Sequence, residues 1–406
     1  MPEKDKQLLF AKHPLDEDSP AYFKPGTGLV LQSKNKLFMI APRLRVQLRE
    51  TVDVVSEVGE PREVEQSFQL RRARVQFKGH VFGEHNKYKL ELAFSPRDLG
   101  MRDGVVTRSP LLTWYVEFDY LRDLTVRAGQ YKIPYSRQRV ISSGDLELVD
   151  RSLANGEFNL DRDIGLDIRS NDLFGLGGRL RYYAGLYVGE GRDHYENESL
   201  VADDAQAGGL MYLARLEVLP MGDFKDYSEV DFKRSPKPRL SLGAAYAFLD
   251  EAKGTRGILG SAPEDGGTTD YHNFTADMLL KWTGVTLLGE FYWRRGKRNP
   301  GDATIVDESG VTVPAPITAP RDGLGWTLQL GYLIPRTRLG LAARYSQARG
   351  IGEDTSLVDK DEVGGGINYF FAGHPLKLQL DYFHQRPDGL DGGFADAVRL
   401  QLQFAY

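Results

Sequence analysis

The stretch from Leu124 to Ile168 reads LTVRAGQYKIPYSRQRVISSGDLELVDRSLANGEFNLDRDIGLDI and consists of a strand pattern, a long polar segment and a second strand pattern. Apolar residues alternate with polar or small ones from Leu124 to Gly129 and again from Asp163 to Arg169, and this period of two is typical of a β-strand with two different faces. Residues 130–160 hold neither a helical nor a strand period, and they carry basic and acidic side chains together. Most loops of this length are functional or disordered. The architecture of the rest of the chain therefore decides whether this loop constricts a pore or lies on a surface.

The composition of the 406-residue chain excludes several classes of protein. No run approaches the ~18 apolar residues of a transmembrane helix, which excludes a helical membrane protein but not a barrel, because a barrel strand is apolar on one face only. The absence of cysteine excludes disulfides, thiolate metal sites and cysteine nucleophiles. A net charge of -5 over so long a chain argues against nucleic acid as a partner.

The period of two continues from Phe38 to the end of the chain. Besides the two strands above, it covers residues 44–48, 73–77, 88–94, 112–120, 180–188, 210–218, 240–248, 274–282, 285–293, 326–332, 339–345, 363–371, 376–382 and 398–406. A slip of parity between Phe68–Leu70 and Ala73–Phe77 predicts a β-bulge. Many of these segments approach the ~9 to 11 residues of a membrane-spanning strand. We therefore predict an all-β fold, a closed antiparallel transmembrane β-barrel of about sixteen strands over residues 38–406.

The connections between these strands alternate in length, as in outer-membrane barrels, where periplasmic turns are short and external loops are long. The short ones are 83–85, 121–122, 171–177, 283–284, 335–336 and 372–374; the long ones are 51–65, 95–110, 130–160, 189–207, 250–267, 295–322 and 347–357. Residues 220–238 are the exception, since they are long and charged at a short-turn position, and a missed pair of strands is one interpretation. The last strand closes on Tyr406, and this terminal aromatic residue resembles the assembly signal of outer-membrane barrels. Residues 1–37 lack the alternation and are interpreted as a polar N-terminal tail or plug, with any export signal removed from the sequence given.

The polar positions of a barrel whose apolar positions face lipid must face the lumen. In the first three strands this set is strongly basic, with Glu91 as its acid. Its basic members are Arg43, Arg45, Arg49, Arg72, Arg74, Lys78, Lys87 and Lys89. In the other strands the lumen set mixes acids and bases. This distribution of charge fits two interpretations equally well: a cationic wall that selects anions, and a solvated polar face without ion selectivity.

Three strings resemble the phosphate- and polyphosphate-selective porins O and P of Gram-negative outer membranes. They are FQLRRARVQF at 68–77, VRAGQYKIPYS at 126–136 and NLDRDIGL at 159–166. The resemblance implies a trimeric sixteen-stranded porin whose third long loop, residues 130–160, folds into the lumen as the constriction. It further implies that Lys132 and Ser136 lie at this constriction and that Arg71 and Arg72 are lumen arginines of the second strand.

The function we expect is passive diffusion of small hydrophilic solutes through the outer membrane, above all of anions such as phosphate. Ammonium and guanidinium groups stabilise an oxyanion, the first as a point charge and the second bidentately. The expected pathway residues are Lys132, Ser136, Arg137, Arg139, Arg71, Arg72, Arg74, Arg43, Arg45 and Lys78. The expected partners are inorganic or organic ions, outer-membrane lipid and further copies of the chain in a homotrimer, with no cofactor.

Alternatives remain open at the level of sequence. A general or cation-preferring porin of the same fold is one, because the loop also carries Asp145, Glu147 and Asp150 and the chain is net acidic. A soluble all-β module that captures carbohydrate in the cell envelope is another. A barrel hydrolase with His194 in an outer loop is a third, although no Walker loop, nucleophile elbow or HExxH motif occurs, and we expect no enzyme. The seven histidines show no pair at metal-ligand spacing, so no metal site is expected.

Overall fold

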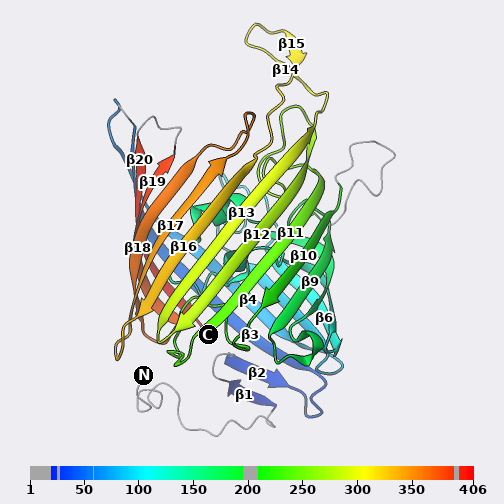
Figure 1. Cartoon of the computed structure of the whole chain (residues 1–406), viewed down its shortest axis with the longest axis vertical. Helices are drawn as coiled ribbons and strands as arrows, with labels where there is room; N and C mark the ends of the chain where they lie inside the picture. The colour runs from blue at the N-terminus through cyan, green and yellow to red at the C-terminus, as the bar shows by residue number, and fades with distance from the viewer. Residues whose placement is uncertain (1–19, 25–27, 58, 195–208, 388–392) are drawn as a thin grey trace.

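The computed structural model describes residues 20–24, 28–57, 59–194, 209–387 and 393–406. In this part of the chain sixteen antiparallel strands form one closed barrel, because each strand pairs with the next and β20 pairs with β3 (Figure 1). The barrel strands are β3 (Met39–Ser56), β4 (Glu63–His80), β5 (Asn86–Ala93), β6 (Leu111–Leu121), β7 (Leu124–Lys132), β8 (Arg162–Ser170), β9 (Leu180–Tyr187), β10 (Met211–Val218), β11 (Arg239–Ala252), β12 (Thr268–Trp282), β13 (Val285–Asn299), β16 (Gly323–Leu333), β17 (Leu339–Gly350), β18 (Lys360–Phe370), β19 (Leu376–Pro387) and β20 (Phe394–Ala405). The predicted fold class and all sixteen strands are confirmed.

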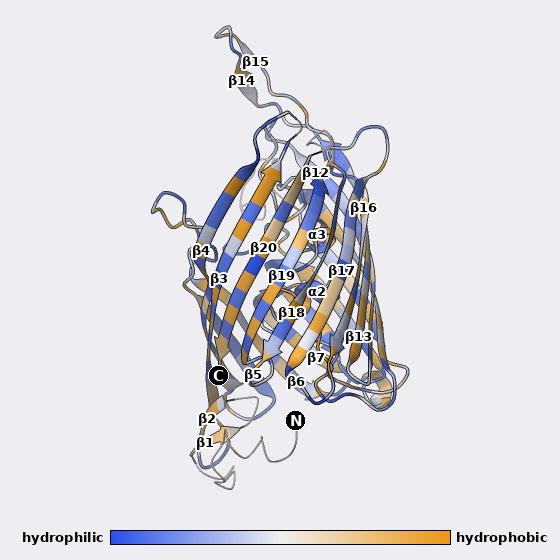
Figure 2. Ribbon diagram, turned by 90° about the vertical axis from the view of Figure 1, so that its left-hand side faces the viewer, coloured by the Kyte–Doolittle hydropathy of each residue, from blue (hydrophilic) through white to orange (hydrophobic). Residues whose placement is uncertain are grey.

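The two faces of the strands reverse the arrangement of a soluble protein. On β20, Leu400 and Leu402 are exposed on the outer surface, whereas Gln401 and Gln403 between them are buried. The same alternation gives the orange and blue bands along the strands in Figure 2. An apolar outer face suits lipid, and the polar inner face suits a water-filled or charged lumen. No helix among the described residues has the length and apolar character needed to cross a membrane.

The connections are sorted by length between the two ends of the barrel (Figure 1). The long ones gather at one end, here called the loop end, where the small hairpin of β14 (Thr304–Val306) and β15 (Thr312–Pro314) extends outward. The short ones and the C-terminus lie at the other end, the turn end. In an outer-membrane barrel the loop end is external and the turn end is periplasmic.

Two predictions need correction at the turn end. Residues 220–238, for which a missed pair of strands was one interpretation, are fully described and contain no strand; residues 219–238 form one long connection between β10 and β11. The predicted polar tail contains a hairpin of β1 (Ala21–Lys24) and β2 (Gly28–Gln32), and β2 pairs with the start of β3. The hairpin was missed because its apolar alternation is too short to predict a strand. Residues 1–19 lie outside the described part of the chain.

A bulge in β4 confirms the slip of parity seen in the sequence. Arg72 pairs with Gln47 while Leu70 pairs with Leu48, so Arg71 is an extra residue in the ladder. As a result both Arg71 and Arg72 are buried, although consecutive residues of a regular strand face opposite sides. The bulge therefore brings two neighbouring guanidinium groups to the inner face.

Between β7 and β8, residues 133–161 form the connection called loop 133–161 here. It contains the short helices α2 (Arg137–Val140) and α3 (Leu153–Phe158), whose first turns are capped by the hydroxyls of Ser136 and Ser152. Its hydrogen bonds reach inward-facing side chains of widely separated strands. Asp150 binds Arg49 of β3, and the backbone N–H of Ala154 donates to Ser346 of β17.

Candidate functional site in the barrel lumen

Three arginines of the inner face surround one carboxylate of loop 133–161. The Oδ2 atom of Asp150 lies 2.6 Å from Arg49 and 2.9 Å from Arg71, and Oδ1 lies 3.5 Å from Arg72. Burial alone would raise the pKa of Asp150, but the charges of Arg49 and Arg72 hold it below its ordinary value. One negative charge among three positive ones leaves this cluster cationic.

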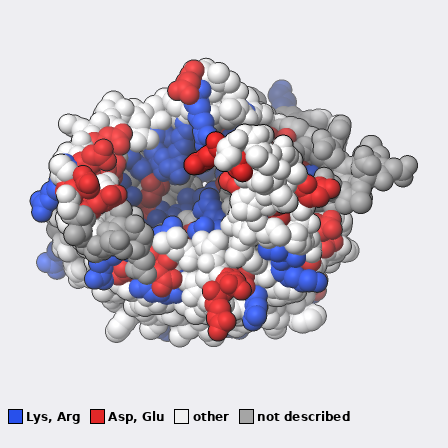
Figure 3. Space-filling model, turned by 90° about the horizontal axis from the view of Figure 1, so that it is seen from above, with Lys and Arg blue, Asp and Glu red and all other residues white. Residues whose placement is uncertain are grey.

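The basic side chains around this cluster belong to three neighbouring strands, and we call them the cationic wall. Its members are Arg43, Arg45, Arg49, Arg71, Arg72, Arg74, Lys78 and Lys89 of β3, β4 and β5. Arg45 donates to the hydroxyl of Ser142 in loop 133–161, and Arg74 binds Asp98 at 2.7 Å. Glu91 forms ion pairs with several members of the wall, among them Lys89 at 3.1 Å. Seen from the loop end, Lys and Arg side chains gather in the hollow of the barrel (Figure 3).

Two further cations of the site are held by backbone carbonyls. The ammonium of Lys132 donates to the carbonyl oxygens of Val140 and Ile141 at 3.3 and 3.0 Å. The guanidinium of Arg151 donates to the carbonyls of Gln138 and Ile141. Neither forms an ion pair with a carboxylate among the described residues. These carbonyls fix the position of the two charges without neutralising them.

Arg139 differs from Lys132 and Arg151 because it pairs with a carboxylate and remains partly exposed. Its Nε atom donates to Asp161 at 2.9 Å, and both side chains are about one fifth exposed. Asp161 also forms an ion pair with Arg162 of β8 at 3.3 Å. Arg139 therefore contributes a charge that is partly neutralised and still reaches solvent.

The structure places Ser136 and Arg137 away from this group. Both side chains are fully buried against the wall of β11, β12 and β13. Ser136 is within hydrogen-bond distance of Glu290 and Tyr292, at 3.3 and 3.0 Å. Arg137 binds Asp277 at 2.6 Å and Asp226 at 2.9 Å. These contacts attach the loop to the barrel and leave no face of either residue open to a passing solute.

The list of expected pathway residues did not include three that the structure brings to the site. Arg49 was assigned to the lumen face by its parity with Arg45, but it was not counted among the pathway residues. Asp150 and Arg151 lie in a loop without any period, so no sequence signal indicates which way they point. Only the path of the loop through the barrel determines their place.

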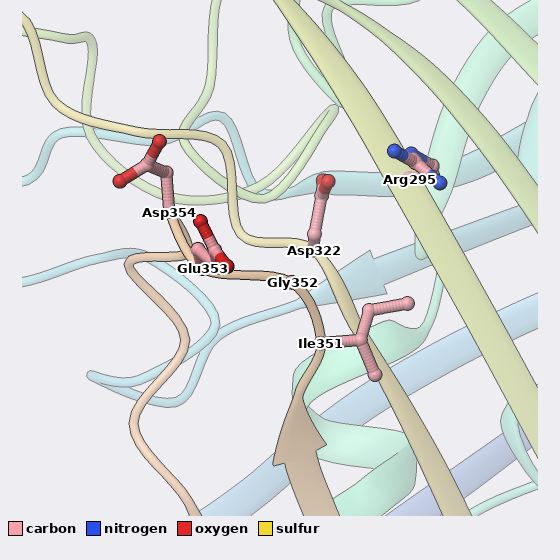
Figure 4. A pocket seen from close by; sticks show the side chains of 6 residues that line it. All are labelled: Arg295, Asp322, Ile351, Gly352, Glu353 and Asp354. Atoms are coloured by element: carbon pink, nitrogen blue, oxygen red, sulfur yellow. The ribbon is translucent and has the colours of Figure 1, made fainter.

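A second hollow lies at the loop end, and its charge is opposite. Asp322, Glu353 and Asp354 line it with a single guanidinium, that of Arg295 (Figure 4). Asp322 accepts a hydrogen bond from the backbone N–H of Gly296 at 2.6 Å. The loop end thus presents acids in this hollow, whereas bases dominate the lumen side of β3 to β5.

The comparisons with known proteins agree with this architecture. Residues 46–198 match a family model described as phosphate-selective porin O and P, which confirms the family resemblance over this stretch. An anion-selective porin from Comamonas acidovorans is 11% identical with a TM-score of 0.59, covering 91% of this chain and 100% of its own. The outer membrane channel DcaP of Acinetobacter baumannii is 10% identical with a TM-score of 0.55, covering 93% and 99%.

A curated protein of Aquifex aeolicus (strain VF5), described as uncharacterized, is 24% identical over 303 residues, which are 72% of this chain and 67% of that protein. At these identities the structural likeness shows the fold. The family match and the barrel together support an outer-membrane channel.

Proposed function

We propose that this chain is a passive outer-membrane diffusion channel that prefers small anions, among them phosphate-like oxyanions, and that loop 133–161 forms its constriction. The observation that carries the proposal is that Lys132 and Arg151 are held by backbone carbonyls, with charges that no carboxylate of the described residues pairs. An anion that loses part of its hydration in a narrow passage is stabilised by such groups.

The acids between these cations fit a channel better than a tight binding site. Asp150, Asp161 and Glu91 each share two or more basic partners, so they lower the local positive charge without removing it. Conduction requires that no single site hold the ion too strongly. A row of partly neutralised cations therefore supports passage from one site to the next.

The reversal potential in a planar bilayer under a KCl gradient tests the proposed selectivity. We expect anion selectivity for the natural protein and a shift toward cations, or a reversal of sign, for Lys132→Glu. Lys253→Glu makes the same charge change in a loop-end residue that is 38% exposed, and should leave the reversal potential nearly unchanged. Cation selectivity of the natural protein, or equal shifts for the two variants, would contradict the proposal.

Adding phosphate to the same bilayer separates the oxyanion preference from general anion selectivity. Phosphate that competes for the cationic sites should reduce the chloride current. If the current does not change, the channel is anion-selective without an oxyanion preference. The resemblance to the porin family also supports a homotrimer in outer-membrane lipid, which chemical cross-linking of the protein in detergent would test.

A further inference from the structure

Segment 219–238, the long connection at the turn end, is buried in a way that a surface turn is not. Its buried members are Leu219, Asp226, Ser228, Glu229, Val230 and Asp231. Most of them are polar or charged, and turns normally keep such residues in water. Their contacts show what covers them.

The segment contacts three successive connections at the turn end, all of which follow it in the chain. Asp231 accepts from the N–H of Gly284 at 3.0 Å, between β12 and β13. Arg234 donates to the carbonyl of Leu333, at the end of β16. Ser228 lies 3.1 Å from His374, between β18 and β19, where Phe232 also packs edge-on. A segment that leaves β10 and reaches these turns passes beneath the strands from β11 to β18.

The segment is also joined to loop 133–161 above it. The N–H of Glu229 donates to the carbonyl of Asp145 at 3.0 Å, and Asp226 binds Arg137 at 2.9 Å. A small apolar core lies between them and the wall. Its members are Ile141 and Leu146 of the loop, Leu279 and Leu288 of β12 and β13, and Phe224 and Tyr227 of the segment. Loop, segment and wall therefore form one packed block.

Glu147 of the loop and Glu229 of the segment form a carboxyl pair within this block. The N–H of Glu147 donates to Glu229 at 2.7 Å, and the amide of Gln329 donates to both carboxyl groups. Burial, with the charge of Glu229 in addition, raises the pKa of Glu147 to about 8, against the opposing hydrogen bonds from Thr286 and Gln329. The proton held at neutral pH removes the repulsion that two adjacent carboxylates would exert.

Charged groups of other elements also face the carboxyl pair. They are Lys281 of β12, Lys377 of β19 and Arg151 of the loop. The ammonium groups of Lys281 and Lys377 donate to backbone carbonyls of the segment and the loop, at 2.8 and 2.7 Å. These bonds add to the attachment of both elements.

Solvent reaches the two sides of the lumen unequally. Side chains of Arg137, Glu217 and Asp277, above the segment, are 0% exposed. On the opposite side, 17% of Arg45 and 25% of Lys89 are exposed. Water, and hence a small solute, therefore has access to the lumen along the cationic wall.

We infer that segment 219–238 is a second constricting element, which closes the periplasmic exit beneath β11 to β18 and confines permeating solutes to the cationic wall. This inference rests on the proposed channel function but not on its ion preference. Together the loop and the segment determine how large a solute is admitted.

Replacing residues 220–237 with a short Gly–Ser turn tests the inference directly. Because the segment lies beneath six of the sixteen barrel strands, we expect the conductance to rise by a factor of about 1.5. Liposome swelling with neutral saccharides, which charge does not affect, should show that larger solutes enter. Heat-dependent gel migration verifies that the variant is folded. The matched control shortens the β14–β15 hairpin, which extends away from the barrel, and should leave both measurements unchanged.

Cysteine labelling provides a second test that keeps the segment intact. The chain has no cysteine, so a single introduced thiol is the only target. Lys89→Cys on the cationic wall should react rapidly with a thiosulfonate reagent added at the periplasmic side. Ser241→Cys, on β11 above the segment, replaces a hydroxyl that donates to Asp226 of the segment and is 0% exposed, and it should react at least tenfold more slowly.

The outcomes separate the two proposals. Equal labelling rates, or a folded short-turn variant with unchanged conductance and solute size, would overturn the second constriction alone. If neither the natural protein nor any variant conducts ions, both the channel function and this inference are rejected.

Discussion

The lumen has two walls that carry the same kinds of side chain and differ in how the charges are matched. On the wall of β10 to β18, called the packed wall here, acids and bases occur in complete buried clusters. Arg215 binds Asp277 at 2.7 Å, and Arg344 binds Glu362 at 3.0 Å, with all four side chains at most 4% exposed. On the cationic wall, bases outnumber acids and several side chains reach solvent. The number of charges is therefore a poor guide to selectivity; the charges that remain unmatched and accessible determine it.

Arg137 and Arg139 show the difference within one turn of helix. They lie two residues apart on α2, yet Arg137 is fully buried among Asp226 and Asp277 while Arg139 pairs with the partly exposed Asp161. A buried charge that loses its partner is costly, whereas an exposed ion pair contributes little to stability. Substitutions at the two positions should therefore have different consequences.

The largest expected effect is that of Arg137→Ala on stability. Removing this guanidinium takes one of two basic partners from Asp277 and Asp226, which keep Arg215 and Arg181, and we expect it to lower the free energy of unfolding by about 3 kcal/mol. Arg139→Ala, the matched control, should cost less than about 1 kcal/mol. The temperature at which the folded gel band disappears measures both. Equal shifts would show that the two walls do not differ in the way described.

A second effect concerns the dependence of stability on pH. The pKa of Glu147 is raised from 4.5 to about 8 by burial and by the charge of Glu229. Between these pH values the folded protein holds a proton that the unfolded chain has released, so stability is highest below pH 4.5 and falls as pH rises toward 8. The loss should amount to at most about 5 kcal/mol.

Unfolding temperatures at pH 4.5 and pH 9 measure this loss, and Glu147→Gln should remove most of the difference. The amide keeps a polar group beside Thr286 and Gln329 and does not ionise. An unchanged pH dependence in this variant would assign the effect to other groups.

The smallest expected effect is on selectivity. Asp150→Asn removes the carboxylate that three arginines of the cationic wall share, and should raise the anion-to-cation permeability ratio about twofold, since a unit charge ~8 Å away in water contributes ~0.5 kcal/mol. Glu362→Gln makes the same change on the packed wall and should leave the ratio as it was. Reversal potentials under a KCl gradient compare them. A change of the ratio in both variants would mean that solutes reach both walls.

Strand alternation predicted the barrel well because lipid imposes it. Every segment with a period of two became a strand, and the slip near Arg71 became a bulge. The ends of strands were less predictable: β12 begins at Thr268 and β13 ends at Asn299, several residues beyond the alternating parts. Near the loop end both faces of a strand meet water, so no apolar face marks the strand there.

The interior could not be predicted in the same way. Loop 133–161 and segment 219–238 are held by ion pairs and hydrogen bonds between residues far apart in the chain. For such contacts the sequence shows only polar residues without a period. For this reason the sequence did not reveal that Ser136 and Arg137 are buried. Their surroundings consist of Asp226, Asp277 and Glu290, which belong to distant elements.

The contacts of segment 219–238 also set an order of events during assembly. Its partners Gly284, Leu333 and His374 come later in the chain, and they meet only when the strands from β12 to β19 have paired. Contacts of such wide sequence separation form late, because closing long loops costs entropy. We therefore expect the strands to pair first and the contacts of the turn-end block to form afterwards. A barrel caught between these two stages would have a wider turn-end mouth than the finished protein.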